Sequence, residues 1–312
     1  MRARAVSSRR RSAPWSCHPC PPAPLPPRRR IPMPVEHADW AALGERIGTL
    51  AWPGFPIVLA VLVAVLALTG RRLEGPLRQH AGRAEPRPRD LVIGLVLGFG
   101  AIVVLAMLFA RLAAGLGDGR PMGEMDDALS RAIGLHTPMA VRQAFGWFTH
   151  LGDPLPMVVY CTAAALLLWR HGHRSFAVGW VLANGGNAAL NLSLKNVFER
   201  VRPVHDTALA QAPGFSFPSG HTSSAVVMWG MLAYLALRLA PPRWQVPVLV
   251  LAVAMALSIA ASRVFLQVHY LTDILAGLCS GSAWLAVCIA SLEAARHRRR
   301  LKAHRANQAA TG

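Results

Sequence analysis

The sequence predicts an all-α protein, a polytopic bundle of membrane helices. Its 312 residues are 53% hydrophobic and only 15% charged, with a mean hydropathy of +0.35. Soluble domains carry about 25% charged residues, so this composition lies outside their usual balance. The chain also contains seven long, largely uncharged runs, and lysine and arginine collect in alternate connections between them. Together these observations favour a chain that crosses a membrane several times.

The seven runs are the predicted transmembrane helices, since a hydrocarbon core about 30 Å thick requires roughly 17 to 25 apolar residues. In chain order they cover residues 50–69, 91–112, 154–169, 175–194, 220–238, 244–262 and 271–292. The third run is short, and the fourth is the most polar. The fourth contains Asn184, Asn187 and Asn191, which we expect to hydrogen-bond between helices. Buried helices of a soluble core are the alternative, but seven such runs exceed what soluble cores supply.

The distribution of basic residues predicts how these helices are oriented. The basic segments are the connections 71–90, 170–174 and 238–243 and the tail 293–312. Seven spans place all of these segments on one side of the membrane. We predict that this is the cytoplasmic side of the cell inner membrane. Residues 113–153, 195–219 and 262–273 then face the extracytoplasmic side.

The first 32 residues, which are rich in proline and arginine, are predicted to be a disordered arm. Their eight arginines favour the cytoplasm, whereas seven spans place the N-terminus outside. Translation from Met33 would remove this conflict. We expect four regions: the arm 1–32, an additional N-terminal span with its cytoplasmic loop at 33–90, a membrane domain at 91–292 and a basic cytoplasmic tail at 293–312.

The formal net charge of +18 does not indicate a nucleic-acid partner. Most basic residues lie in the arm, in cytoplasmic connections or in the tail, where topology and anionic lipid headgroups account for them. Membrane lipids are therefore the expected surroundings, and the sequence predicts no oligomeric state.

Three connections on the extracytoplasmic side carry the ionisable residues of a candidate site. Their sequences are KNVFERVRP (195–203), FPSGHTSS (217–224) and SRVFLQVHYLTD (262–273). The cations Lys195, Arg202 and Arg263 suit a phosphate or a similar dianion, because arginine forks bind oxyanions bidentately. Ser219 is a predicted helix N-cap, and the N–H groups of Ser219, Gly220 and His221 would add the positive end of a helix.

Two histidines could divide the chemistry of phosphoryl transfer. His269 and Asp273 are four residues apart, so on a helix they share one face. A carboxylate on one ring nitrogen leaves the other free to attack phosphorus. His221 could protonate the leaving oxygen and later activate water. Taken singly, such residues are more often structural or are interfacial anchors. Their joint occurrence on one side favours catalysis. We interpret Arg200 as an anchor or loop charge.

The motifs K-x6-RP (Lys195 to Pro203), PSGH (Pro218 to His221) and SR-x5-H-x3-D (Ser262 to Asp273) resemble the three-part signature of the type 2 phosphatidic acid phosphatase (PAP2) superfamily. The resemblance covers about residues 91–292. It implies a six-helix core with its site at the outer leaflet and no metal or other cofactor, so run 50–69 is an additional N-terminal transmembrane helix. Gln267 departs from the pattern, since relatives often carry glycine there.

The resemblance also assigns roles to the motif residues. It implies that His269 forms a phosphohistidine, that Asp273 orients it and that His221 is the acid. The residues implied to hold the phosphoryl oxygens are Lys195, Arg202, Ser219, Gly220 and Arg263. The remaining motif positions, Pro203, Pro218 and Ser262, are expected to be scaffold.

The expected activity is hydrolysis of a lipid phosphomonoester or diphosphate. Phosphatidic acid, phosphatidylglycerol phosphate and a polyprenyl diphosphate remain open as substrates. A lipid phosphotransferase and a non-catalytic phospholipid-binding protein are the alternatives. The apolar stripe of Val141, Phe145, Phe148 and Leu151 fits either a short helix on the outer leaflet that guides lipid chains or packing on the other spans.

Overall fold

The computed structural model describes residues 35–81, 88–117, 120–203 and 213–311, and its regular structure over these residues is helical throughout. The predicted arm 1–32 lies outside them. In chain order the elements are α1 (Val35–Ala81), α2 (Pro88–Ala114), α3 (Pro121–His136), α4 (Met139–Thr149), the 3-10 turn η1 (His150–Gly152), α5 (Pro154–Arg170), α6 (Arg174–Phe198), α7 (Gly220–Leu239), α8 (Pro242–Phe265) and α9 (Leu271–Thr311). Each of the seven predicted spans forms a helix.

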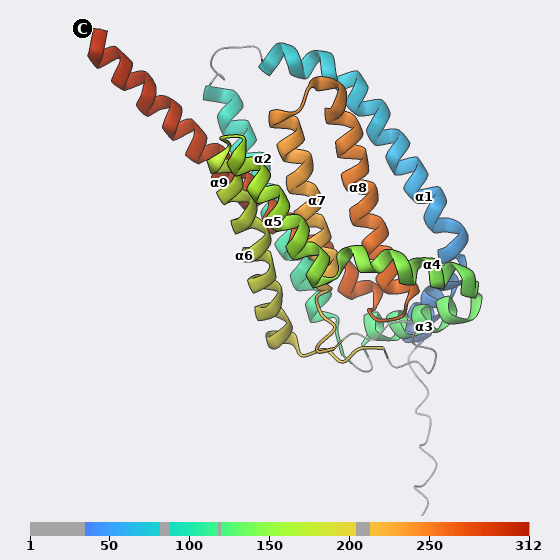
Figure 1. The fold of residues 1–312 in the computed structure, drawn as a ribbon. Coiled ribbons are helices and arrows are strands. Elements are labelled where there is room, and N and C mark those ends of the chain that lie inside the picture. Colours follow the sequence, from blue (N-terminus) through green and yellow to red (C-terminus); the bar gives the residue numbers. More distant parts are fainter. Residues whose placement is uncertain (1–34, 82–87, 118–119, 204–212, 312) are drawn as a thin grey trace, which may run out of the picture. The chain divides into compact units, whose positions relative to one another are not determined.

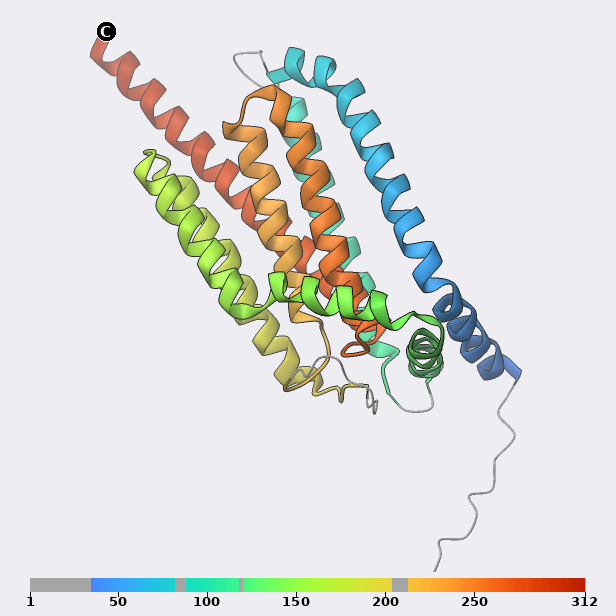
Figure 2. The ribbon, with the colours of Figure 1, turned by 45° about the vertical axis from the view of Figure 1, so that its right-hand side comes forward.

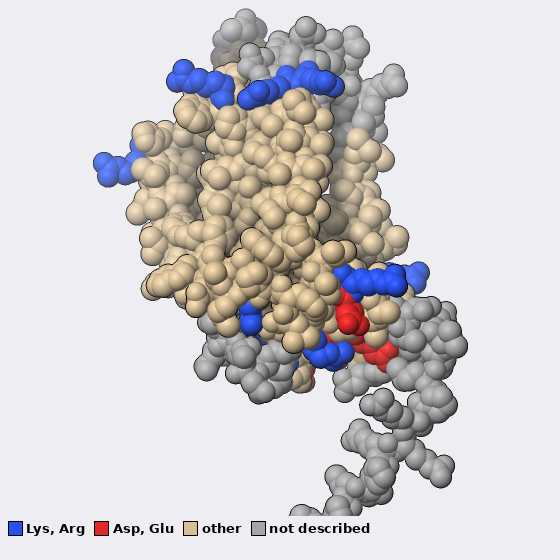
Figure 3. Space-filling model, turned by 90° about the vertical axis from the view of Figure 1, so that its right-hand side faces the viewer, with Lys and Arg blue, Asp and Glu red and all other residues tan. Residues whose placement is uncertain are grey.

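Five of the described helices are long and apolar enough to cross a membrane: α1, α2, α7, α8 and α9. The segment from α4 to α5, bent by 45° at its break, gives a sixth candidate. Helix α6, which contains the most polar predicted span, does not reach the same apolar character. Figure 3 shows an almost uncharged band between two charged ends, as a membrane-embedded surface requires.

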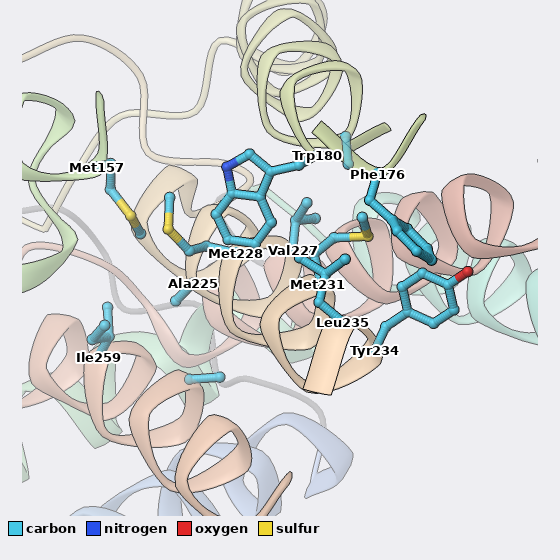
Figure 4. Close-up of a cluster of buried hydrophobic side chains, with 12 residues drawn as sticks. Met157, Phe176, Trp180, Ala225, Val227, Met228, Met231, Tyr234, Leu235 and Ile259 are labelled. Atoms are coloured by element: carbon cyan, nitrogen blue, oxygen red, sulfur yellow. The ribbon is translucent and has the colours of Figure 1, made fainter. Parts of the chain in front are cut away.

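Helix α7 forms the centre of the bundle and packs against α6, α8 and α9 (Figure 1). A buried apolar cluster joins α7 to its neighbours, as Figure 4 shows. Its largest members are Phe176 and Trp180 of α6, Met228, Met231 and Tyr234 of α7, and Ile259 of α8. Close packing of these side chains fixes the start of α7, where the PSGH motif lies.

Asparagines of α6 add hydrogen bonds to this packing. Asn187 and Asn191 donate to Ser223 of α7 over 3.4 Å and 3.2 Å, so the predicted hydrogen bonds between helices are confirmed for these two. The prediction is wrong for Asn184, whose amide donates to the Trp180 carbonyl of its own helix at 3.0 Å.

The additional N-terminal helix α1 lies against α3, with further contacts to α8. A Cβ at Gly44 would stand 2.3 Å from the Met125 carbonyl oxygen, and one at Gly48 would stand 2.6 Å from that of Leu129. Glycines four residues apart therefore allow the two backbones to approach, as in many membrane helix pairs. Helix α1 thus holds α3 in place beside the connection between α8 and α9.

Helix α4 crosses the ends of α7 and α8 at a steep angle (Figure 2). The ring of Phe145 stacks on Phe265 with centroids 4.7 Å apart, and Phe55 meets Phe145 edge-on at 5.9 Å. Phe148 packs against the central cluster. Phe145 and Phe148 therefore pack on the other helices, whereas Leu151 of the same stripe is 37% exposed. The alternative of a lipid-guiding surface helix is wrong for these two phenylalanines.

Candidate active site

The three predicted connections meet at one end of the bundle, around a cavity of about 970 Å³. The predicted residues that line it are Lys195, Arg202, Gly220, His221, Arg263 and His269. Ser219 and Asp273 lie behind this lining and are fully buried. Residues more than 70 positions apart in the sequence thus share one cavity, which is the juxtaposition that the motifs predict.

The ring of His269 is held by the carboxylate of Asp273. Its Nδ1 atom lies 3.2 Å from Asp273 Oδ2, which also accepts the Tyr270 backbone N–H at 3.0 Å. Helix α9 begins at Leu271, so His269 precedes the helix and Asp273 lies in its first turn. A bond to Nδ1 leaves Nε2 with its lone pair, as a nucleophilic imidazole needs.

Burial lowers the pKa of His269 to about 3, although Asp273 works against this shift. The side chain is only 2% exposed. The neutral ring is therefore the form present near neutral pH.

Arg202 and Lys195 now bind carbonyl groups of the segment 213–215. Arg202 donates through Nε to Gly214 at 2.9 Å and through Nη2 to Phe215 at 3.1 Å, and Lys195 donates to Phe215 at 2.7 Å. Arg202 Nη1 also lies 3.0 Å from His269 Nε2. These carbonyl oxygens accept from the donors that an oxyanion would use, so an anion would have to displace them in order to bind.

Arg263 has a donor that is not already bonded to a carbonyl oxygen. Its Nη1 donates to Thr149 Oγ1 at 2.8 Å, whereas its buried Nε has no hydrogen-bond partner among the residues that the structure describes. Leaving a buried charged donor unpaired costs about 1–3 kcal/mol or more. Arg263 itself lines the cavity, where its positive charge favours a bound oxyanion.

The start of α7 has the predicted N-cap but fewer available N–H groups than expected. Ser219 Oγ accepts from the Thr222 hydroxyl at 3.0 Å, and from its backbone N–H at 3.5 Å. The Ser219 backbone N–H donates to the Asp273 carbonyl at 3.0 Å, so it would have to leave this bond to contact an anion. Gly220 and His221 remain as the first turn facing the cavity.

Sequence reasoning missed Asp153, the partner of His221. His221 Nε2 lies 2.9 Å from Asp153 Oδ1, and His150 Nδ1 lies 2.7 Å from Asp153 Oδ2. His221 and Asp153 are 68 residues apart and share no motif. The only signal was an acid at the mouth of an apolar run.

Arg200, interpreted as an anchor, is instead part of a buried network, so that interpretation is wrong. Its guanidinium donates to Asp273 Oδ1 at 2.7 Å and to Asp126 Oδ2 at 2.9 Å, and it lies over the Tyr270 ring. Thr272 also bonds to Asp126 and Arg200. Although burial opposes its charge, the two carboxylates raise the pKa of Arg200 above its ordinary value.

Gln267 adopts a left-handed backbone with φ of 56°, which accounts for glycine being suited to this position. Its side chain accepts from Arg142 Nη2 at 2.8 Å and donates to the Ser130 carbonyl at 2.7 Å. These two buried bonds offset the backbone strain that a glycine would avoid.

The cavity is also lined by apolar side chains, which are Met157, Val158 and Cys161 of α5, Ala188 and Leu192 of α6, and Met228 of α7. Thr162, Asn184, Asn191 and Ser224 add polar groups to the same helices. The lining therefore combines groups that suit a phosphate with groups that suit a hydrocarbon chain. Among the described residues, no three side chains of His, Cys, Asp or Glu are grouped to hold a metal ion.

Comparisons with known proteins match the same part of the chain. Residues 158–296 match the family model described as the PAP2 superfamily. The chain is 32% identical over 184 residues to phosphatidylglycerophosphatase B of Bacillus subtilis (strain 168), covering 57% of this chain and 88% of that protein. It also resembles the crystal structure of a transmembrane PAP2 type phosphatidylglycerolphosphate phosphatase from Bacillus subtilis, with a TM-score of 0.55 and 30% identity over 62% of this chain and 96% of that one. The family-model match contains every predicted site residue, whereas Asp126 and Asp153 precede it.

Proposed function

We propose that this chain, which belongs to the PAP2 superfamily, hydrolyses the phosphate group of a membrane lipid through a phosphohistidine at His269. The family and the all-α membrane fold predicted from the sequence are confirmed. The observation that carries the proposal is one cavity lined by an oriented histidine, three cations and several apolar side chains. A non-catalytic phospholipid-binding protein would have no use for the His269–Asp273 pair.

In the first step, His269 Nε2 attacks phosphorus in line with the leaving oxygen. The N–P bond forms as the P–O bond to the lipid breaks, and its electron pair goes to the leaving oxygen. His221 supplies the proton that this oxygen takes up. Arg202 Nη1, now 3.0 Å from Nε2, exchanges the nitrogen for a phosphoryl oxygen when substrate binds.

Positive charge fixed in the cavity stabilises the transition state. Charge spreads over three equatorial oxygens in phosphoryl transfer, and fixed donors aimed at them lower the barrier. Arg202, Arg263 and Lys195 serve this role together with the first turn of α7. Ser219 acts indirectly, as the cap that holds this turn. Because these groups supply the charge that a metal would otherwise bring, we propose that the reaction needs no metal.

In the second step, water attacks the phosphohistidine. His221 takes a proton from this water as the new O–P bond forms and the P–N bond breaks. Inorganic phosphate leaves, and both histidines return to their starting states. The cavity mouth is proposed to face the extracytoplasmic side, as the basic connections at the other end of the bundle favour.

The apolar walls favour a phosphate attached to a hydrocarbon chain. The curated relative is named for phosphatidylglycerol phosphate, so we place that lipid first and keep phosphatidic acid and polyprenyl diphosphate as competitors. The test is phosphate release by purified protein in detergent from each of the three lipids, with EDTA and with vanadate. We expect activity that survives EDTA and is inhibited by vanadate.

Two further arms separate the alternatives. Without acceptor lipid, a hydrolase releases phosphate at the full rate, whereas a phosphotransferase needs the acceptor and labels it. No turnover of any lipid phosphate by folded wild-type protein would contradict the proposal.

A further inference from the structure

His150, Asp153 and His221 form a chain of hydrogen bonds along the cavity wall. His221 Nε2 lies 2.9 Å from Asp153 Oδ1, and Asp153 Oδ2 lies 2.7 Å from His150 Nδ1. The side chain of His221 is 18% exposed, that of Asp153 is 35% exposed and that of His150 is 66% exposed. All three line the cavity that contains His269. The chain therefore runs from the candidate acid toward solvent.

The carboxylate of Asp153 is committed to these histidines instead of to its own helix. Asp153 is the N-cap residue of α5, a position where aspartate ordinarily accepts a backbone N–H of the first turn. Its side chain makes no such bond here. The local sequence thus forgoes a common helix-stabilising contact, worth about 0.5–2 kcal/mol, and gives both oxygens to imidazole rings.

The backbone before Asp153 is shaped to approach His221. A Cβ on Gly152 would lie 3.1 Å from His221 Cδ2 and 2.9 Å from Ile259 Cγ2, so only glycine lets η1 pass this closely. Gly152 is buried. This close approach brings the carboxylate of the next residue within hydrogen-bond distance of the ring.

We propose that Asp153 is a positioning residue for the leaving-group acid: it orients His221 and stabilises its protonated ring, while His150 holds the second oxygen of Asp153. The inference rests on the proposed phosphatase function. Arg263 and Lys195 face the same cavity, and their charges oppose a proton on His221. The carboxylate of Asp153 acts against burial and these charges, which together still favour the neutral ring of His221.

The proton balance follows from the bonded nitrogen. Nε2–H of His221 stays with Asp153, so the proton donated in the first step comes from Nδ1 and goes to the leaving oxygen as the P–O bond breaks. In the second step Nδ1 recovers a proton from the attacking water. Asp153 and His150 undergo no net change over the cycle.

This role makes activity depend on the leaving group. An alkoxide from a lipid phosphate needs a proton as it departs, whereas the phenolate of p-nitrophenyl phosphate does not. The ratio kcat/KM reports steps through formation of the phosphohistidine, so it isolates this requirement. For Asp153→Asn we expect kcat/KM to fall about 100-fold on the lipid phosphate, as for loss of a general acid, and far less on p-nitrophenyl phosphate.

The controls separate this role from a structural one. Asp153→Ser keeps a residue that can cap α5 while removing the carboxylate, and it should show the same leaving-group pattern. Glu45→Gln, a matched change at an exposed position of α1, should leave both substrates unaffected. Combining Asp153→Ser with His221→Ala should cost little beyond His221→Ala alone, because the two residues act as a unit.

Equal losses on both substrates, no loss on either, or additive effects in the double variant would overturn the role of Asp153. A wild-type protein that turns over neither substrate would instead overturn the proposed function. The two failures are thus distinguishable in one set of assays.

Discussion

The Nη1 atom of Arg202 lies 3.0 Å from the Nε2 atom of His269, the nitrogen that the Asp273 bond leaves unprotonated. The same guanidinium donates to Val268 at 2.8 Å and to carbonyls of 213–215. The nucleophile and one phosphate-binding cation are therefore already paired before substrate arrives. A bound phosphate would separate the Arg202 guanidinium from the His269 ring and lie between the two.

The first prediction concerns this cation. Arg202→Lys keeps the charge but loses the fork that can hold two oxygens, so we expect kcat/KM to fall about 10²-fold or more, in the range found when one transition-state donor is removed. Inhibition by vanadate should weaken in parallel, because vanadate resembles the transferring phosphoryl group. Unchanged vanadate inhibition in Arg202→Lys would show that Arg202 does not contact the anion.

The second prediction concerns Arg200. Arg200→Gln leaves Asp126 and Asp273 buried without their cation, and breaking a buried ion pair costs about 3–5 kcal/mol. Thermal unfolding in detergent should show this loss. Adding Asp126→Asn should recover part of the stability, since one uncompensated charge is then removed. If the single and double variants unfold at the same temperature, Arg200 and Asp126 are not coupled.

The third prediction concerns the left-handed backbone at Gln267. Both Gln267→Ala and Gln267→Gly remove the bonds to Arg142 and Ser130, so both should be less stable than the wild type. Glycine alone is free of strain at φ of 56°, so Gln267→Gly should be more stable than Gln267→Ala by about 1 kcal/mol. Denaturation of the two variants side by side measures this difference, and the opposite order would contradict the account.

The fourth prediction concerns pH. Burial lowers the pKa of His269 to about 3, whereas an unfolded histidine titrates near 6.5. Between these values the unfolded chain binds a proton that the folded chain does not. The free energy of unfolding therefore decreases as pH falls through this window, by at most about 1.4 kcal/mol per pH unit from this group.

His269→Asn removes this contribution, so its stability should decline less steeply than that of the wild type between pH 7 and pH 5. Thermal unfolding of both proteins across this range provides the comparison. Parallel curves would mean that His269 has the same pKa in the folded protein as in the unfolded chain.

Much of the fold and the central part of the site follow from the sequence. Long apolar runs favour helices, because a membrane core has no water to satisfy the backbone and a β-strand would cross it in only about 9–11 residues. The three motifs each contain both a turn and the side chains it presents, so Lys195, His221 and His269 could be assigned to one cavity. The role of Gln267 was partly visible, since a position suited to glycine indicates an unusual backbone.

What the sequence could not predict depends on tertiary contacts. The pairing of Asp153 with His221 arises where η1 passes α7, and no local pattern encodes that crossing. Arg200 resembled an anchor because its partner Asp126 lies on α3, 74 residues away. The Ser219 N–H is taken by the Asp273 carbonyl only because α9 begins beside α7. Each miss involves a partner supplied by another element.

The central claim, a phosphoryl group carried by His269, is tested most directly by trapping it. Wild-type protein mixed with a lipid carrying a ³²P-labelled terminal phosphate and quenched in alkali should retain label that acid releases, as a phosphohistidine does. Peptide mapping should place the label at His269. With ³²P-labelled p-nitrophenyl phosphate, whose leaving group needs no proton, His221→Ala should accumulate more label because water attack slows. Label on another residue would contradict the account. So would the absence of label from His221→Ala while this variant still turns over the substrate.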